Sequence, residues 1–434
     1  MARLKALRGT RDILPDEMAR WYLAESRARE IFARYGYREI RTPIIEAYEL
    51  FARGIGEGTD IVHKEMYVLQ RGRERVALRP ENTAPVVRAY LEHSLQQTLP
   101  LSRFYYIGAQ FRYERPQKGR QRQFHQIGVE VLGEDSPLVD AETIAMVLEY
   151  LNALRLEDLG LLINSVGDPA CRPAYRDSLR DYLEPLLGKL CEDCNRRYES
   201  NPLRVFDCKV EADRALLQEA PRMLDQLCDP CAENFTAVRA ALERLEVPYR
   251  VEPRLVRGLD YYVRTAFEVT SGKLGAQDAV LGGGRYDGLV QALGGPPVPG
   301  FGFAIGLERV IMLLPDDHPD LPEGGVDLFL VAVGDKAHHH LSDLARQLRR
   351  QGHSVLYEYR PRTLGAQMKR ANRLQARLAL ILGEQELARK ACVLKRMSDG
   401  SQREVPLTEL SGAVNTLLEA GRHDRDRGEK QDGE

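Results

Sequence analysis

The chain has 434 residues, 43% apolar and 29% charged, which is enough apolar material for the cores of two or three domains. Its formal net charge of −2 argues against a protein that binds nucleic acid over its whole surface. No apolar run approaches the roughly 18 residues of a membrane helix, and no secretory signal begins the chain. We therefore expect a protein of the reducing cytoplasm without membrane contact.

The secondary structure pattern changes along the chain. Residues 15–35 have apolar side chains at helical spacing between Pro15 and Gly36, and Pro43 stops the short strand that follows. A basic turn joins two β-rich runs and indicates an antiparallel hairpin. The elements predicted in chain order are a helix over 15–35, strands over 37–43, 104–113 and 124–133, a helix over 138–155, and strands over 159–166, 254–270 and 277–293.

Two composition shifts predict the domain organisation. Residues 170–250 hold six of the seven cysteines in a mostly helical pattern, which indicates an insertion. A proline- and acid-rich linker, 315–325, is the predicted domain boundary. Beyond it, strands over 328–333, 354–359 and 378–382 alternate with helices over 337–351 and 364–378, as in an α/β domain with a mostly parallel sheet.

Charge also divides the chain at this linker. Residues 326–420 contain 15 Lys and Arg against 10 Asp and Glu, a net charge of +5, whereas the first 325 residues carry −6. A basic C-terminal module suits a polyanionic partner, although a solvated basic surface gives the same numbers. The tail 422–434 is rich in charge and is expected to be disordered.

Two segments carry most of the candidate chemistry, and neither is a glycine-rich phosphate loop. Residues 111–122 place five cations and one carboxylate at the tip of the predicted hairpin, and clustered arginines suit bidentate phosphate contacts. Residues 301–309 lead through small side chains to Arg309. Taken singly, the first could be a solvated turn and Arg309 a surface residue whose stem covers apolar neighbours.

Together these segments closely resemble motifs 2 and 3 of class II aminoacyl-tRNA synthetases, and 35–43 resembles motif 1, which implies a homodimer. Residues 257–268 and 282–288 resemble the two histidine-specific motifs of histidyl-tRNA synthetases. The resemblance runs from Arg8 to the end of the C-terminal domain. It implies a histidine–tRNA ligase, which activates L-histidine with ATP and Mg²⁺ to histidyl-adenylate and transfers it to tRNA(His).

The same resemblance assigns roles to individual residues. Arg112, Arg120 and Arg309 would bind ATP, and Arg257 with Arg112 would lie beside the carboxylate and the α-phosphate, so that Arg112, Arg257 and Arg309 form the catalytic set. The histidine pocket would consist of Glu81, Thr83, Arg112, Gln126, Glu130, Arg257, Tyr261, Tyr262 and Tyr286. Gln117 and Arg122 would meet the tRNA acceptor end. Taken alone, Glu130 could be an exposed ion-pair partner and Tyr262 a core residue.

The resemblance also implies the fold class. This is an α+β class II synthetase antiparallel sheet flanked by helices over 1–325, with the helical insertion at about 170–250 and a C-terminal α/β anticodon-binding domain over 326–421. A non-catalytic regulatory paralogue of ATP phosphoribosyltransferase shares the fold and is the alternative function. Such paralogues lack the C-terminal module and degrade the motif residues, whereas Arg112, Arg257, Arg309 and 326–420 are all present here.

The cysteines of the insertion leave two interpretations open. Cys191 and Cys194 form one C-x-x-C pair and Cys228 and Cys231 another, with Cys208 between them. Four such thiolates would suit one structural zinc ion. Reduced thiols packed inside a small helical insertion are the alternative.

Overall fold

The computed structural model describes residues 3–56, 59–275, 278–321 and 324–428, and the chain divides into two compact units, 1–321 and 322–434. The side chains described end at residue 419. Among the described residues, no helix is both long enough and apolar enough to span a membrane. The two units are described separately below.

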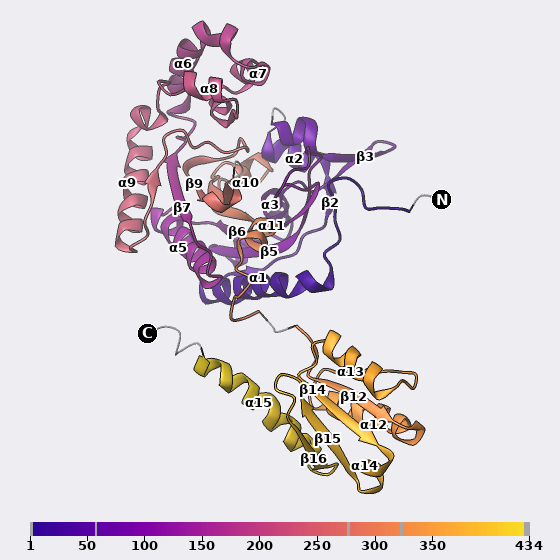
Figure 1. The fold of residues 1–434 in the computed structure, drawn as a ribbon. Helices are drawn as coiled ribbons and strands as arrows, with labels where there is room; N and C mark the ends of the chain where they lie inside the picture. Colours follow the sequence, from indigo (N-terminus) through magenta and orange to yellow (C-terminus); the bar gives the residue numbers. More distant parts are fainter. Residues whose placement is uncertain (1–2, 57–58, 276–277, 322–323, 429–434) are drawn as a thin grey trace. The chain divides into compact units, whose positions relative to one another are not determined.

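The first unit is built on a large mixed sheet (Figure 1). Its strands are β1 (Arg38–Glu39), β5 (Ser102–Phe111), β6 (Gln123–Leu132), β7 (Leu159–Ser165), β8 (Arg250–Val251), β9 (Val263–Ser271), β10 (Ala279–Arg285) and β11 (Gly300–Gly306). They are ordered β1-β5-β6-β11-β10-β9-β7-β8. The six central strands run antiparallel to their neighbours, and the outer pairs β1/β5 and β7/β8 are parallel.

Four helices cover one face of this sheet: α1 (Pro15–Arg34), α5 (Pro137–Ala153), α9 (Asp229–Arg244) and α11 (Leu307–Leu313). Helix α1 starts with a proline in its first turn and ends with Arg34 in its last, which suits the helix dipole. Its buried stripe includes Trp21, Ile31 and Phe32. Burial of each such side chain contributes about 1.5–3 kcal/mol, so this face forms the main core.

The opposite face carries shorter elements and a second, three-stranded sheet. They are β2 (Ile45–Ala47), α2 (Tyr48–Ile55), η1 (Ile61–Glu65), β3 (Tyr67–Arg71), β4 (Glu74–Leu78), α3 (Thr83–Glu92), α4 (Leu95–Thr98) and α10 (Leu289–Ala292). The short η5 (Gly272–Leu274) belongs to the first face, where Leu274 packs against the main core. The small sheet has the order β2-β4-β3. Helices α3 and α10 pack their apolar side chains against the large sheet and leave part of its surface to the candidate site.

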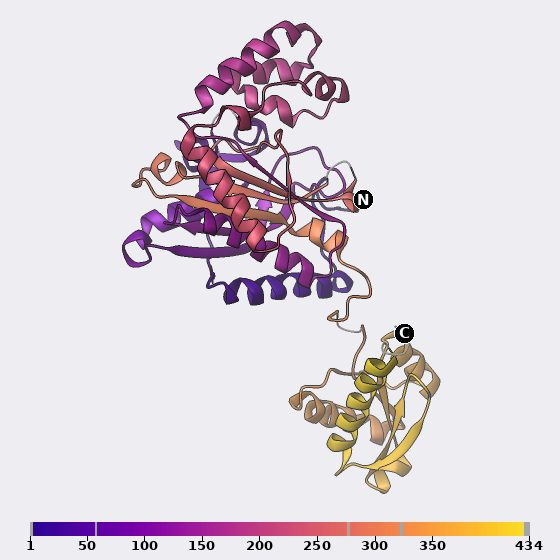
Figure 2. The same cartoon turned by 90° about the vertical axis from the view of Figure 1, so that its left-hand side faces the viewer.

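The insertion is helical and stands off the sheet in both views (Figures 1 and 2). Its elements before α9 are α6 (Arg172–Leu183), η2 (Glu184–Lys189), α7 (Glu192–Ser200), η3 (Pro202–Asp207), α8 (Glu211–Leu216) and η4 (Met223–Gln226). It has a small core of its own, in which Tyr175, Leu179 and Leu183 of α6 pack against buried cysteines.

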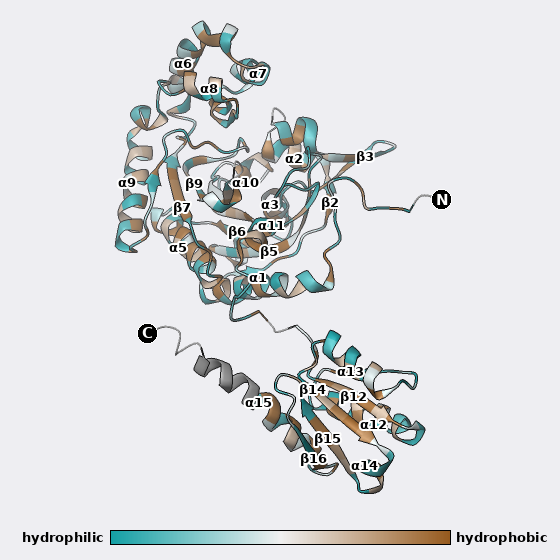
Figure 3. Cartoon of the chain, viewed as in Figure 1, coloured by the Kyte–Doolittle hydropathy of each residue, from teal (hydrophilic) through white to brown (hydrophobic). Residues whose placement is uncertain are grey.

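The second unit is a five-stranded sheet with helices. Its elements are β12 (Leu328–Val333), α12 (Asp335–Arg350), β13 (Val355–Tyr357), α13 (Leu364–Arg373), β14 (Leu378–Gly383), α14 (Glu384–Ala388), β15 (Ala391–Arg396), β16 (Gln402–Pro406) and α15 (Leu410–Gly428). The sheet order is β13-β12-β14-β15-β16. Strands β12 and β14 are strongly apolar (Figure 3), because they lie inside the sheet with both faces covered.

Several elements differ from the sequence predictions. The strand predicted over 277–293 ends at Arg285, because the turn that follows leads into helix α10. The sheet of the second unit is parallel only at β13-β12-β14, since β15 and β16 add an antiparallel hairpin. Helix α15 continues to Gly428, into the tail predicted to be disordered, and 429–434 lie outside the described residues.

Candidate active site

The candidate site lies on the face of the large sheet opposite to α1 and α5. Because side chains alternate along a strand, Ile127 and Val129 of β6 enter the main core while Gln126, Gly128 and Glu130 point to the other face. Strand β11 pairs with β6 in register, with Gly302 opposite Glu130. A buried carboxylate therefore lies on the floor of the site, next to a residue without a side chain.

Glu130 is 1% exposed and has two hydroxyl partners. Its Oε1 accepts a hydrogen bond from Thr83 Oγ1 at 2.7 Å, and its Oε2 accepts one from the Tyr286 hydroxyl. Burial raises the pKa of Glu130 to about 8, although hydrogen bonds from Tyr286 and Thr83 oppose this shift. The ligand-free carboxyl therefore keeps its proton near neutral pH, and it can serve as an acceptor for a ring N–H donor once it ionises.

Glycine is required at two positions of the floor. A Cβ atom on Gly302 would lie 2.2 Å from Glu130 Oε2, and one on Gly282 would lie 2.0 Å from a terminal nitrogen of Arg257. Both distances are far below van der Waals contact, so any larger residue would displace the charged group. The glycines of β10 and β11 therefore make room for Glu130 and Arg257.

A second carboxylate, Glu81, lies at the start of α3 and is 4% exposed. It accepts hydrogen bonds from the backbone N–H groups of Thr83 at 2.7 Å and Ala84 at 3.1 Å. Burial raises its pKa, and these backbone donors at the helix N-terminus partly offset the rise. Glu81 is therefore held in a fixed position beside the Thr83 hydroxyl that contacts Glu130.

Aromatic rings and an amide complete the pocket. Tyr261 lies with its ring centroid 4.7 Å from that of Tyr262 and 5.7 Å from that of Tyr286. Gln126 is 9% exposed, and its Oε1 has no hydrogen-bond partner among the described residues. A buried acceptor without a partner is unfavourable, so this oxygen suits a ligand donor.

Arg257 lies on the same face and pairs with Glu268 of β9. Its Nη1 lies 2.5 Å from Glu268 Oε2, and its guanidinium lies 6.0 Å from the Tyr262 ring centroid. Burial alone would lower the pKa of Arg257, but the Glu268 carboxylate outweighs it and the pKa lies above its usual range. The arginine is therefore charged and oriented from one side, and its Nε has no partner in the described part of the chain.

Three more arginines lie around Glu114 and the start of β10. Arg112 donates from Nε to Pro80 O at 2.9 Å, and Arg120 lies 2.8 Å from Glu114. Arg309 donates from Nε to Gly119 O at 3.3 Å, and burial followed by the charge of Arg120 lowers its pKa. Positive charges held this close together by backbone contacts suit a polyphosphate.

The two residues expected to meet tRNA lie in the turn between β5 and β6. Gln117 forms an isolated β-bridge with Arg120, and Arg122 lies over the Tyr113 ring at 3.9 Å. Arg122 donates from Nε to Glu114 O at 3.3 Å, and its carbonyl accepts a hydrogen bond from the Arg112 backbone N–H at 2.9 Å.

Comparisons with known proteins decide the family. The family model described as histidyl-tRNA synthetase matches residues 9–310, and the model described as anticodon binding domain matches 327–417. The chain belongs to the histidyl-tRNA synthetase family. A protein named histidine–tRNA ligase from Moorella thermoacetica is 51% identical over 417 residues, which are 95% of this chain and 98% of that protein.

Solved structures agree with this membership of the histidyl-tRNA synthetase family. The crystal structure of apo histidyl-tRNA synthetase from S. aureus has a TM-score of 0.80 at 37% identity, covering 95% of this chain and all of that one. A Bacillus halodurans structure described as an ATP phosphoribosyltransferase regulatory subunit/histidyl-tRNA synthetase matches at a TM-score of 0.63 and 20% identity, over 88% and 99% of the two chains. The latter likeness shows the fold alone. The fold class expected from the motifs is confirmed.

Sequence reasoning missed three residues at or near this candidate site. Tyr106 lies opposite Gly128 across the β5/β6 pair and fills the space above that glycine. Glu268 is the last residue of the 257–268 motif, and Arg257 is the first. Their positions in one motif were the available signal for their ion pair. Lys209 of the insertion lies near Arg120 and Arg309. Desolvation, and then the charges of these two arginines, lower the pKa of Lys209.

One motif arginine has a structural position instead. Arg285 is fully buried and pairs with the buried Asp140 of α5 and with Asp287 at 3.2 Å. Removing one partner of such a buried pair costs about 3–5 kcal/mol. In this synthetase Arg285 therefore fixes the end of β10 against α5.

The four cysteines predicted to share one zinc site do not lie together. Cys191 and Cys194 cluster with Cys208 and Asp213, whereas Cys228 and Cys231 cluster with Cys171 and Asp168. The physical reason is that each C-x-x-C pair begins a different helix, α7 or α9. The single four-cysteine site is therefore corrected to two separate clusters.

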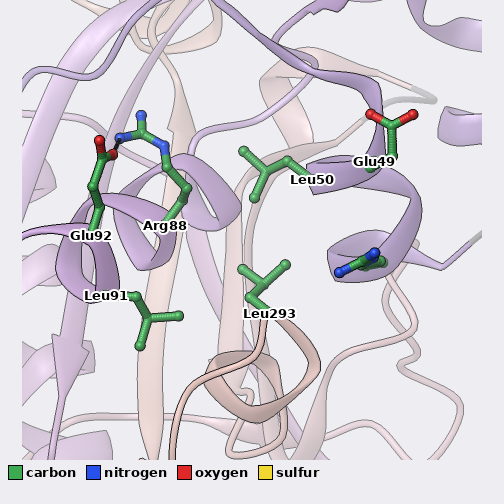
Figure 4. Close-up of a pocket in the computed structure, with 7 residues that line it drawn as sticks. Glu49, Leu50, Arg88, Leu91, Glu92 and Leu293 are labelled. Carbon is green, nitrogen blue, oxygen red and sulfur yellow. Dashed lines mark hydrogen bonds and ion pairs between the residues drawn. The ribbon is translucent and has the colours of Figure 1, made fainter. Parts of the chain in front are cut away.

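Two cavities lie in the first unit. A cavity of about 150 Å³ connects Arg257 and Tyr262 with Arg172, Arg176 and Arg204 of the insertion. Another, of about 570 Å³, lies between α2, α3 and the end of α10 and includes Arg88 and Leu293 (Figure 4). The second contains none of the predicted site residues. The first borders the Arg257 side of the synthetase site.

Proposed function

We propose that the chain is a histidine–tRNA ligase that forms histidyl-adenylate from L-histidine and ATP and transfers the histidyl group to tRNA(His). The observation that carries this proposal is the buried Glu130 carboxyl, held by Thr83 and Tyr286, with Arg257 on the same sheet face. An imidazole ring needs different partners for its two nitrogens, and a carboxyl with tyrosine hydroxyls can supply both.

The proposed substrate orientation follows from charge. Glu81, Thr83 and Gln126 receive the α-ammonium, whereas Glu130, Tyr261 and Tyr262 enclose the ring with Tyr286 nearby. Glu81 is buried without a cationic side-chain partner among the described ion pairs, so an ammonium is a suitable counter-charge. A pocket built on such hydrogen bonds rejects analogues that lack them by about 10⁴-fold.

The proposed reaction is an in-line displacement at phosphorus. A carboxylate oxygen of histidine attacks the α-phosphorus of ATP, the new O–P bond forms, and the bond to the departing pyrophosphate breaks. Arg257 and Arg112 lie where negative charge develops, and Arg120 and Arg309 hold the other phosphates. Catalysis then consists of positioning and electrostatic stabilisation, without a covalent enzyme intermediate.

The family implies Mg²⁺ with ATP, and the donor set near the arginines fits it. Glu114 and Glu268 are partly buried carboxylates among Arg112, Arg120 and Arg257, and Mg²⁺ is commonly held by one or two carboxylates together with substrate phosphates. When bound, the ion would neutralise phosphate charge.

Partners and location complete the proposal. Residues 1–325 form the catalytic part with the insertion at about 170–250, Gln117 and Arg122 face the acceptor end of tRNA, and 326–421 bind the anticodon region. The exposed Ile44 and Ile45, directly after the motif 1 segment, support a homodimer, because exposed apolar residues suit an interface. We further propose a cytoplasmic location and zinc in the cysteine-rich insertion.

Charging of tRNA(His) tests this function. The full chain with histidine, ATP and Mg²⁺ is expected to esterify the tRNA, and a truncation after Leu321 is expected to retain pyrophosphate exchange but lose most charging at limiting tRNA. The reason is that every residue proposed for adenylation lies in the first compact unit. Loss of phosphate contacts should also weaken the salt dependence of tRNA binding.

A folded truncation is confirmed by circular dichroism and its oligomeric state by sedimentation. Equal loss of both reactions in that protein would contradict the proposed division of roles. A full chain that charges no tRNA would instead favour the regulatory-subunit alternative.

A further inference from the structure

The insertion contains two clusters of the same composition. The first, called the Asp168 cluster, consists of Asp168, Cys171, Cys228 and Cys231, and the second, called the Asp213 cluster, consists of Cys191, Cys194, Cys208 and Asp213. In each, one ligand atom from every residue lies within 4.8 Å of the others. Each cluster thus offers three sulfurs and one carboxylate oxygen, the donor number of a structural zinc site.

Several distances within each cluster lie close to the edges of a zinc-centred tetrahedron, and all other ligand-atom pairs lie within 4.8 Å of one another. Zn–S bonds of about 2.3 Å at tetrahedral angles place two sulfurs about 3.8 Å apart, and a sulfur and an oxygen about 3.5 Å apart. Cys191 Sγ lies 3.8 Å from Cys208 Sγ, and Cys208 Sγ lies 3.3 Å from Asp213 Oδ2.

The Asp168 cluster has the same spacing. Cys171 Sγ lies 3.9 Å from Cys231 Sγ, and Asp168 Oδ1 lies 3.5 Å from Cys171 Sγ and 3.7 Å from Cys228 Sγ. In both clusters these distances are close to those expected between the ligands of one zinc ion. The sulfur and oxygen atoms are therefore already arranged for metal binding.

Local backbone N–H groups point at the sulfurs of both clusters. Cys191 and Cys228 are the N-cap residues of α7 and α9, and their C-x-x-C partners lie in the first turns of those helices. Helix N-termini stabilise negative charge. Backbone N–H groups also reach sulfur, from Asp168 to Cys171 Sγ at 3.3 Å and from Val210 to Cys208 Sγ at 3.4 Å. Such outer contacts orient metal ligands.

A buried carboxylate distinguishes a metal site from packed thiols. Asp213 is 1% exposed, and its partners in the described part of the chain include the Cys191 backbone N–H and the thiols of Cys191, Cys194 and Cys208. No ion pair between Asp213 and a Lys, Arg or His is found among the described residues. A buried carboxylate that lies among three thiols and pairs with no cationic side chain is a suitable fourth ligand for a divalent metal ion.

We infer that the insertion binds two zinc ions, one in the Asp168 cluster and one in the Asp213 cluster. The inference deepens the zinc proposed above and is independent of histidine activation. On binding, the cysteine thiols lose their protons to solvent and four protein ligands close each site. The Asp168 zinc joins the start of α6 to the start of α9, and the Asp213 zinc joins α7 to the segment before α8.

Zinc content of the full chain tests this inference. Protein prepared with zinc under reducing conditions and then desalted is expected to contain about two zinc ions per chain by elemental analysis. Cys171→Ser and Cys208→Ser should each reduce the content to about one, and the double variant to near zero. Cys392→Ser is the matched control, because Cys392 is a buried cysteine of the second unit and belongs to neither cluster.

Two further measurements keep the result interpretable. If a variant does not fold, zinc released from the unsubstituted protein by a mercurial reagent and captured by a colorimetric chelator counts the ions directly. Cobalt substitution should give thiolate-to-cobalt charge-transfer absorption, of which each single variant loses about half.

Several results would overturn the inference. One is a zinc content below about half an ion per chain after zinc has been supplied. Another is a protein with one zinc ion that both single variants lose. A third is the finding that these cysteines form disulfides with one another even when the protein is prepared with a reductant. Histidine-dependent pyrophosphate exchange is measured on the same samples. Failure of the zinc inference with normal exchange would leave the proposed ligase function intact, and the reverse result would leave the metal sites intact.

Discussion

Replacing Arg257 with alanine is expected to lower the rate of histidyl-adenylate formation about 10²-fold or more, by analogy with the loss of one preorganised donor from a transition-state site. Glu268 holds the guanidinium at 2.5 Å, and Gly282 leaves the space it occupies. A charge fixed in this way stabilises a transition state without reorganisation during the reaction. The histidine KM should change much less than the rate.

Single-turnover adenylation with saturating histidine measures this effect. Arg250→Ala is the matched control, because Arg250 lies on the edge strand β8 and its side chain is 71% exposed. The control should keep the normal rate. A near-normal rate with a large rise in KM for Arg257→Ala would mean that Arg257 binds the carboxylate equally in ground and transition states.

Replacing Glu130 with glutamine is expected to lower kcat/KM for histidine by about 10–10²-fold, the value of one hydrogen bond to a charged group. The amide keeps the shape of the side chain and part of its contact with Thr83 and Tyr286. Unlike the carboxyl, it cannot ionise to become a negative acceptor for the ring. The loss should be specific for histidine and leave the KM for ATP nearly unchanged.

The same substitution should alter the pH dependence of stability in the protein without histidine. The folded pKa of Glu130 is about 8, whereas the unfolded carboxyl titrates near its ordinary value of 4.5. Between these values the folded protein binds a proton that the unfolded chain does not bind. The free energy of unfolding should therefore fall as pH rises through this window, by up to about 1.4 kcal/mol per pH unit.

Urea unfolding at several pH values between 5 and 8 measures this slope. Glu130→Gln should remove the contribution, whereas Glu74→Gln, at an exposed position of β4, should retain it. The same dependence of unfolding free energy on pH in the unsubstituted protein and both variants would contradict this prediction. It would show that Glu130 is ionised over the whole pH range and that other interactions offset the cost of its burial.

Long periodic elements could be predicted from the sequence, and short exposed ones could not. Helix α1 and the β5/β6 hairpin have 10 or more residues per element and clear apolar spacing. The β2-β4-β3 sheet was missed because its strands have three to five residues, and β3 is mostly exposed. The β3/β4 pair is a short local hairpin, but β2 pairs with β4 across about 30 residues of chain, and local patterns do not reveal that contact.

The candidate site shows the same contrast. Glu130 and Arg257 lie in long motifs and could be singled out from the sequence. Tyr106 could not, because its place over Gly128 depends on strand register. The prediction of a single four-cysteine zinc site was wrong for a related reason. Asp168 and Asp213 have no distinguishing pattern in the sequence, and only the fold brings them close to the cysteines.

Histidine-dependent exchange of pyrophosphate into ATP tests the central claim most directly. The purified chain is assayed with Mg²⁺ and each of the twenty amino acids in turn. The Glu130 pocket and the arginines around it predict exchange with histidine and background rates with the other nineteen. Exchange with a different amino acid, or with none in a folded and stable preparation, would contradict the account.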